Sequence, residues 1–297
     1  MYDRIVIAVD GSDEARRAAR RGLQLAQGFD ATVTILSVVE QKALRLTETS
    51  EEKTRLRERG EEALTDIEEL ASEFGRPVTT TLTEGKAAVQ ISEYASEQDA
   101  DLIVVGRQGL TGLGRRLLGG VTEQVLHRSD VPVLVVPGED DAEMEADYTR
   151  VLITTDGSEN ADVAIPHGIA IAQRYDSAVH VLNVVDLQAA GGVFHAGGLE
   201  KEFIERLDAR GQDAVDSVAT KIEDSAPELT VETAVERTAS FEGATAGVRE
   251  YVEETDVDLV VMGSHGRSNL QRQLIGSVAS TVLRTVDVPV LVVKRSG

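Results

Sequence analysis

Short apolar, β-branched runs alternate along the chain with longer amphipathic stretches. In the first half the apolar runs read RIVIAV, ATVTILSVV, PVTTTL, DLIVVG and PVLVV. The stretches between them have helical spacing at about residues 13–28, 51–74, 86–98 and 120–128. Runs such as LIVV and VLVV are apolar at every position, which is typical of parallel strands covered on both faces. The pattern therefore predicts a doubly wound α/β fold.

The same pattern occurs twice. Residues 4–12 read RIVIAVDGS and residues 150–158 read RVLITTDGS, and the later runs DLIVVG and VPVLVV also recur as DLVVMG and VPVLVV. The early match is offset by 146 residues and the later ones by 157. The second copy therefore carries 11 extra residues between its second and fourth strands. They include the glycine-rich run around residues 189–198, for which a lid over a ligand and a surface insertion without a role are both open interpretations.

An acidic segment, GEDDAEMEAD, separates the two copies and follows the last strand of the first. Its composition is that of a linker. We therefore expect one domain over residues 1–140, an acidic linker over 141–147 and a second domain over 148–297.

Helix ends carry further signals. Ser12 or Asp13 can cap the first helix, Gly28 is expected just past its end, and Ser158 repeats the cap in the second copy. Pro166 falls inside the equivalent helix at 159–174, where a proline costs ~3 kcal/mol unless the helix kinks or restarts.

Composition excludes several classes of function. The chain has no cysteine, so disulfides, thiol nucleophiles and cysteine-ligated metals are ruled out. Aromatic residues make up only 3% and the net charge is −22, which argues against a nucleic-acid partner. No apolar run reaches the ~20 residues of a membrane span, and the start MYDRIVIAVD is not a secretory signal. We expect a cytoplasmic protein with no membrane partner.

The basic residues are strongly skewed, with six lysines against twenty-four arginines. A very acidic, lysine-poor surface stays hydrated in molar salt, where the Debye length shrinks to ~3 Å. The composition therefore predicts a halophilic protein, and an acidic mesophilic protein is the alternative.

Glycines follow the fourth strand of each copy with one spacing. Gly263 and Gly266 are followed, after nine intervening residues, by Gly276-Ser277, and residues 106–120 repeat the three glycines. Glycine after a strand lets backbone N–H groups approach a phosphate, and the helix that opens at Gly276 offers its positive end to an anion. Ser277 can cap that helix or bond a phosphate. The motif therefore predicts an anion site at the carboxyl ends of the strands.

These motifs together resemble the universal stress protein family, and specifically its tandem two-domain members. The family's nucleotide motif is Gly-x2-Gly-x9-Gly-(Ser/Thr); residues 263–277 satisfy it, whereas Gly120 replaces the hydroxyl residue in the first copy. The resemblance covers nearly the whole chain. It implies two tandem Rossmann-like, adenine-nucleotide-binding domains, each a five-stranded parallel sheet with helices on both faces. It also implies ATP as ligand, which Mg²⁺ could accompany, bound more tightly by the second copy.

The resemblance further implies a role for each matching position. Asp10 and Asp156 would lie beside the adenosine, and Val38 and Val184 would line the adenine pocket through their backbone. The other implied contacts are Gly106, Gly109, Gly119, Gly120 and Val121 in the first copy, and Gly263, Gly266, Gly276, Ser277 and Val278 in the second.

Each of these residues also has a simpler interpretation. The aspartates can be turn residues, the glycines turn punctuation and the valines strand core. His265 has no carboxylate or serine spaced for a triad, so a loop histidine is expected rather than a catalytic one.

We expect a nucleotide-binding regulatory module rather than an enzyme, because no Walker lysine, paired carboxylates or general base is evident. ATP would order the loop after the fourth strand and change the surface offered to an unknown protein client. The alternatives are a slow ATPase or nucleotidyl-transfer enzyme, and an assembly module whose pockets no longer bind nucleotide. The apolar closing strands predict an intrachain pseudo-dimer, to which a further homodimer could be added.

Overall fold

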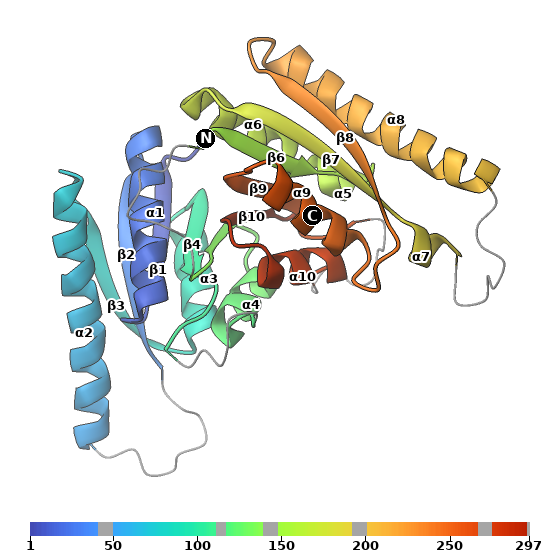
Figure 1. Ribbon diagram of the computed structural model, residues 1–297. Helices are drawn as coiled ribbons and strands as arrows, with labels where there is room; N and C mark the ends of the chain where they lie inside the picture. The colour runs from blue at the N-terminus through green and yellow to red at the C-terminus, as the bar shows by residue number, and fades with distance from the viewer. Residues whose placement is uncertain (41–49, 111–116, 139–147, 192–200, 267–274, 296–297) are drawn as a thin grey trace. The chain divides into compact units, whose positions relative to one another are not determined.

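The computed structural model describes residues 1–40, 50–110, 117–138, 148–191, 201–266 and 275–295 (Figure 1). The chain divides into two compact units, Met1–Ala146 and Asp147–Gly297. Among the described residues, no helix has the length and apolar character that crossing a membrane requires.

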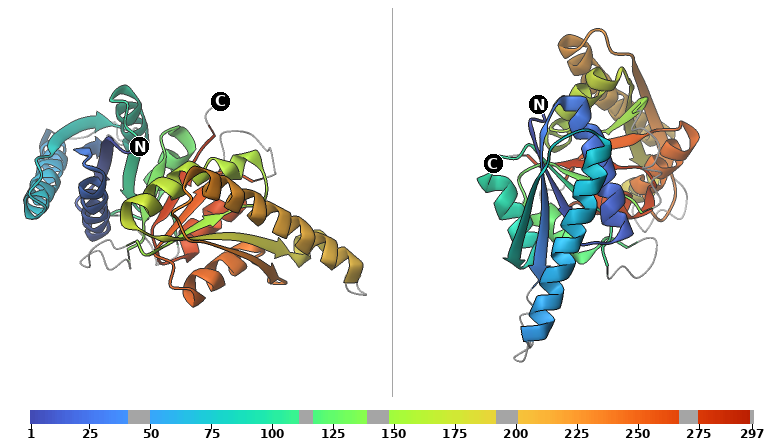
Figure 2. Two further views of the ribbon diagram at one scale, coloured as in Figure 1. Left: turned by 90° about the horizontal axis from the view of Figure 1, so that it is seen from above. Right: turned by 90° about the vertical axis from the view of Figure 1, so that its left-hand side faces the viewer.

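The first unit is a five-stranded sheet in which every strand pair is parallel. The strand order is β3-β2-β1-β4-β5. In Figure 2, α1 and α2 lie on one face of this sheet, and α3 and α4 on the other. The elements are β1 (Arg4–Val9), α1 (Asp13–Phe29), β2 (Thr32–Glu40), α2 (Ser50–Glu73), β3 (Thr79–Gly85), α3 (Ala87–Glu97), β4 (Leu102–Gly106), α4 (Gly120–Arg128) and β5 (Val133–Val136).

The second unit repeats this topology, with parallel strands in the order β8-β7-β6-β9-β10. Helices α6 and α8 pack together on one face, and α9 and α10 pack together on the other (Figure 1). The elements are β6 (Arg150–Thr154), α5 (Glu159–Asp162), α6 (Ile165–Tyr175), β7 (Ala178–Asp186), α7 (Leu187–Gly191), α8 (Lys201–Ser225), β8 (Val231–Thr238), α9 (Ala244–Glu254), β9 (Leu259–Gly263), α10 (Ser277–Thr285) and β10 (Val290–Val293). The predicted α/β architecture is therefore present in both copies.

Burial along the strands follows the sheet order. Every residue of β4 and of β9 is buried, as their continuous apolar sequence predicts for inner parallel strands. The outer strand β3, with sequence TTTLTEG, is only partly buried. The core of each unit thus lies between the inner strands and the helices on their two faces.

The helix caps are largely as predicted. Ser12 Oγ accepts a hydrogen bond from the Ala15 N–H (3.1 Å), and Ser158 Oγ accepts one from the Ala161 N–H (3.3 Å). Gly28, however, lies inside α1, and the helix is ended by Asp30 in the left-handed conformation (φ 57°). The Gly28 prediction was wrong because an aspartate also tolerates this conformation.

Pro166 divides the first helix of the second unit. The single helix expected over 159–174 is two helices, α5 and α6, and Pro166 lies in the first turn of α6. A proline at this position removes no helical hydrogen bond, because the first N–H groups of a helix have no partner within it.

The 11 extra residues of the second copy are distributed over two places. Glu40 at the end of β2 corresponds to Asp186 at the end of β7, an offset of 146 residues. Their partners in the neighbouring strands, Gly85 in β3 and Thr238 in β8, are offset by 153 residues. The offset reaches 157 at α3 and α9. Seven extra residues therefore precede β8 and four follow it. The predicted lid at 189–198 lies outside the described residues from 192 onward, and it stays a prediction.

Candidate functional site

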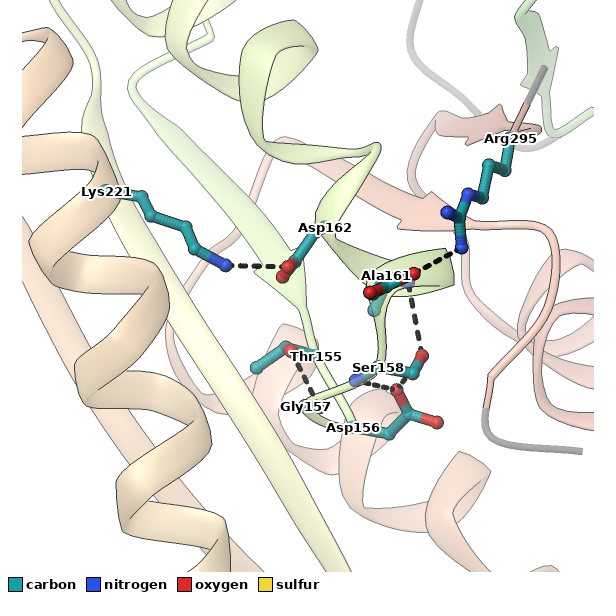
Figure 3. A network of polar contacts seen from close by, with 9 residues as sticks. Thr155, Asp156, Gly157, Ser158, Ala161, Asp162, Lys221 and Arg295 are labelled. Atoms are coloured by element: carbon teal, nitrogen blue, oxygen red, sulfur yellow. Dashed lines mark hydrogen bonds and ion pairs between the residues drawn. The ribbon is translucent and has the colours of Figure 1, made fainter. Parts of the chain in front are cut away.

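The turn after the first strand of each unit is built around an aspartate. Asp156 Oδ1 accepts hydrogen bonds from the Ser158 N–H (3.0 Å) and from Ser158 Oγ (2.6 Å), as Figure 3 shows. Between them Gly157 has φ +76°, a conformation that favours glycine. Asp10 makes the same turn, with Oδ1 accepting from the Ser12 N–H (3.0 Å). Both aspartates are therefore turn residues, as their simpler interpretation predicts.

The second carboxylate oxygen of each aspartate faces the glycine loop after the fourth strand. A Cβ built on Gly266 would overlap Asp156 Oδ2, and one built on Gly109 would overlap Asp10 Oδ2. In the first unit Asp10 Oδ2 also accepts from the Leu110 N–H (2.9 Å). The aspartate and the second glycine of the motif are thus in direct contact, although about 100 residues separate them in the sequence.

The first glycine of each motif serves packing. A Cβ on Gly263 would overlap the carbonyl oxygen of Asn160, and one on Gly106 would lie 3.0 Å from the carbonyl oxygen of Gln108 and 3.3 Å from that of Glu14. The start of the first helix therefore passes close to the end of the fourth strand in both units, and in the first unit the loop itself is close as well. The third glycine joins the loop to the next helix: the Gly276 N–H donates to Ser264 O and the Gly119 N–H to Arg107 O, both at 2.8 Å.

A cavity of about 190 Å³ opens in the second unit at the carboxyl ends of β6, β7 and β9. All seven residues expected of a site in this copy contribute to its lining: Asp156, Val184, Gly263, Gly266, Gly276, Ser277 and Val278.

The cavity lining is partly apolar and partly polar. Leu182, Val184, Val248 and Met262 supply aliphatic and thioether surface. The polar part comes from the start of α10 and from Thr154, Thr155, Asp156, Asn183, Ser264 and His265. Such a combination suits a flat apolar group joined to an anion.

Ser277 is the first residue of α10 and is exposed. Gly276 occupies the cap position, so the expectation that Ser277 caps this helix was wrong. Ser277 is one of the residues that line the cavity, and its phosphate role remains a prediction.

One wall of the cavity comes from residues that the motif did not indicate. Ala244 and Val248 lie in the first turns of α9 and line the cavity. The nearby Gly247 is packed on Val184, since a Cβ there would lie 2.6 Å from Val184 Cγ1. In the sequence, α9 directly follows the outer strand β8, so its first turn lies at the carboxyl edge of the sheet, where the cavity opens. This order of elements is the only signal that could have predicted the wall.

Three of the corresponding positions of the first unit carry different side chains, and two of these are larger. Gln90 stands where the second unit has Gly247, and Arg107 and Gln108 stand in place of Ser264 and His265. Arg107 and Gln108 are buried, and Gln108 Nε2 donates to the carbonyl oxygen of Leu117 (2.6 Å).

The other residues predicted for a site in the first unit are placed as follows. Val38 is partly buried in β2. Gly119 and Gly120 stand at the start of α4, and Val121, which follows them, is exposed.

His265 was expected to be a loop histidine, and it is one that lines the cavity. Its Nδ1 lies 2.9 Å from Ser264 Oγ. Ser264 and His265 both line the cavity, so this hydrogen bond lies in its wall.

Comparison with known proteins identifies the family. The model of the universal stress protein family matches residues 1–137 and 147–294. The chain belongs to this family. A universal stress protein of Mycolicibacterium smegmatis is 29% identical to this universal stress protein over 304 residues, which cover 98% of this chain and 96% of the relative. One from Methanocaldococcus jannaschii is 41% identical over 140 residues, covering 46% of this chain and 82% of the relative.

The solved structures agree on the fold. A universal stress protein from Archaeoglobus fulgidus superposes with a TM-score of 0.73 at 20% identity, covering 99% of this chain and 97% of that one. At this identity the likeness establishes the tandem Rossmann-like fold and nothing about ligands.

Proposed function

We propose that this universal stress protein binds an adenine nucleotide, ATP, in the cavity of its second unit. The observation that carries the proposal is that three distant segments meet there: Asp156 after β6, Val184 in β7, and the glycine motif from Gly263 to Ser277. These are the positions at which the chain resembles the nucleotide motif of its family.

The character of the lining supports this ligand. Val184, Val248 and Met262 would pack on the adenine, and Asp156 would face the ribose. Gly276 and Ser277 would hold the phosphates at the positive end of α10. A bound ATP supplies a polyanion, and Mg²⁺ would accompany its phosphates.

The nucleotide acts as a signal in this proposal. Its binding changes the surface around the cavity and hence the affinity for a protein client in the cytoplasm. A ligand achieves this only through a difference in its affinity for the two surface states.

Slow ATP hydrolysis is the second candidate, and the Ser264–His265 contact at 2.9 Å favours it. Steady-state phosphate release distinguishes it from binding alone. A nucleotidyl-transfer enzyme and an assembly module without nucleotide are the remaining alternatives.

The test is to denature the purified chain and identify any released nucleotide by mass, with its ratio to protein. We expect adenine nucleotide at up to one equivalent per chain. A ratio near zero, at the salt concentration in which the protein is folded, together with no ATP binding in calorimetry, would contradict the proposal.

The two units should bind unequally. Ser277→Ala should weaken ATP binding by roughly 10- to 150-fold, since a hydrogen bond to a charged group contributes ~1.5–3 kcal/mol. Gly120→Ser restores the hydroxyl to the first unit, and nothing lies within 4 Å of a Cβ there, so the side chain fits. Calorimetry on both variants measures the effect; equal affinities of the two units, unmoved by either substitution, would refute the asymmetry.

A further inference from the structure

Two positions at the glycine loop differ in charge between the two units: the buried Arg107 of the first unit replaces Ser264 within the loop, and a second difference lies beside the loop. The residue four places after the aspartate of the turn is Glu14 in the first unit and Asn160 in the second. Each lies in the first turn of the helix that follows, and each is partly buried. The pair is a natural comparison, because the surrounding topology is the same.

Glu14 directs its carboxylate at the backbone of the loop. Oε2 accepts a hydrogen bond from the Gln108 N–H (2.8 Å), between the first and second glycines of the motif. Oε1 packs against the segment after β5, since a Cβ built on Gly138 would lie 2.5 Å from it. A formal negative charge is therefore fixed directly against the loop, and it uses one of the loop N–H groups.

Asn160 makes the opposite kind of contact. Its Nδ2 donates a hydrogen bond to the carbonyl oxygen of Gly266 (3.2 Å), at the second glycine of the motif. The side chain is neutral and satisfies a loop acceptor instead of a loop donor. The second unit thus has no carboxylate from this position against its loop.

The difference in charge between Glu14 and Asn160 should affect the binding of anionic ligands more than that of neutral ones. A carboxylate within a few ångströms of a phosphate repels it strongly in a partly buried site, whereas it hardly affects an uncharged nucleoside. A loop N–H already bonded to a carboxylate must also break that bond before it can serve a phosphate.

We propose that this position determines which unit accepts a phosphate chain: Asn160 permits ATP in the second unit, and Glu14 rejects it from the first. The inference rests on the proposed nucleotide binding and adds to it a specificity residue in each unit. Both residues act through the glycine loop and are not assigned a contact with the ligand.

The test exchanges the two residues. In calorimetry with ATP and with adenosine, Asn160→Glu should weaken ATP binding by at least tenfold and adenosine binding by less than about threefold, because a charge acts mainly on the phosphates. Asn160→Gln, which is neutral and matched in length to glutamate, is the control and should retain ATP affinity within a few-fold. Glu14→Asn should add or strengthen a second ATP equivalent per chain. Thermal unfolding in the same buffer checks that each variant is folded.

The outcomes separate the two proposals. If the wild-type chain binds neither ATP nor adenosine, the nucleotide function fails, and this inference fails with it. If wild-type ATP binding is present but Asn160→Glu and Asn160→Gln behave alike, the inference alone is overturned. Equal losses for ATP and adenosine in Asn160→Glu would overturn it as well, because they would show a distorted site instead of a charge effect.

Discussion

At the scale of single residues, the second glycine of each motif is set by a carboxylate and not by backbone conformation. Gly109 and Gly266 are not among the glycines with positive φ, yet a Cβ at either would overlap an aspartate oxygen. The second glycine therefore has the same place in both copies because the aspartate of the first turn contacts the glycine loop there, whichever ligand binds.

This contact gives a prediction by double substitution. Gly266→Ala should lower the free energy of unfolding by about 2 kcal/mol, the usual cost of an inserted methyl group in a tight contact. Made in an Asp156→Ala background, the same change should cost less than half as much, because the overlapping oxygen is gone. Denaturant unfolding of the four proteins measures the coupling. Additive effects would contradict the contact.

His167, in the first turns of α6, gives a pH prediction. Burial lowers the pKa of its imidazole from 6.5 to about 4. The unfolded chain therefore takes up a proton before the folded chain does as the pH falls, and stability is lost between pH 6.5 and about 4. We expect the wild type to lose about 1–2 kcal/mol more than His167→Gln between pH 7 and pH 5, measured by denaturant unfolding. Parallel pH profiles for the two proteins would refute this.

At the scale of elements, the helix that follows the first strand is continuous in the first unit and divided into two in the second. Helix α1 runs unbroken over Asp13–Phe29, whereas its counterpart is divided before Ile165. The cap at Ser158 and the approach of Asn160 to Gly263 are preserved, so α5 keeps the part of the helix that builds the site.

Proline substitutions test this division. Pro166→Ala should change the free energy of unfolding by less than about 1 kcal/mol, because no helical hydrogen bond is regained at the start of α6. The matched position in α1 is Arg20, and Arg20→Pro should cost about 3 kcal/mol more than the control Arg20→Ala. If Pro166→Ala stabilised the chain by about as much as Arg20→Pro destabilises it relative to Arg20→Ala, the α5–α6 break would not be a true helix start.

At the scale of the whole molecule, charge is the dominant feature. The formal net charge is −22 in 297 residues. The pairing of the closing strands into a pseudo-dimer, predicted from their apolar sequence, stays a prediction, and separate expression of the two halves would test it through their self-association.

The charge predicts the response to salt. Raising KCl from 0.2 M to 2 M should raise the thermal midpoint of the chain by at least about 5 °C, because screening removes repulsion among exposed carboxylates. Thermal unfolding followed by circular dichroism measures this, with an isosmolal uncharged osmolyte as control. A midpoint that is unchanged or lower in 2 M KCl would favour the acidic mesophilic alternative over the halophilic one.

The resemblance to the family implied the seven lining residues of the cavity. The sequence by itself determined the repeat, the α/β class and the helix cap at Ser158, and left the first cap to Ser12 or Asp13. These depend on local periodicity, turn chemistry and motif spacing, which a chain carries in neighbouring residues. Only the tertiary structure decided the wall from α9, the contact of Asp156 with Gly266, and the opposite contacts of Glu14 and Asn160 with their loops. Each of these joins segments that are far apart in sequence. Parallel strand order brings their carboxyl ends to one edge, and no local pattern encodes which side chains then meet.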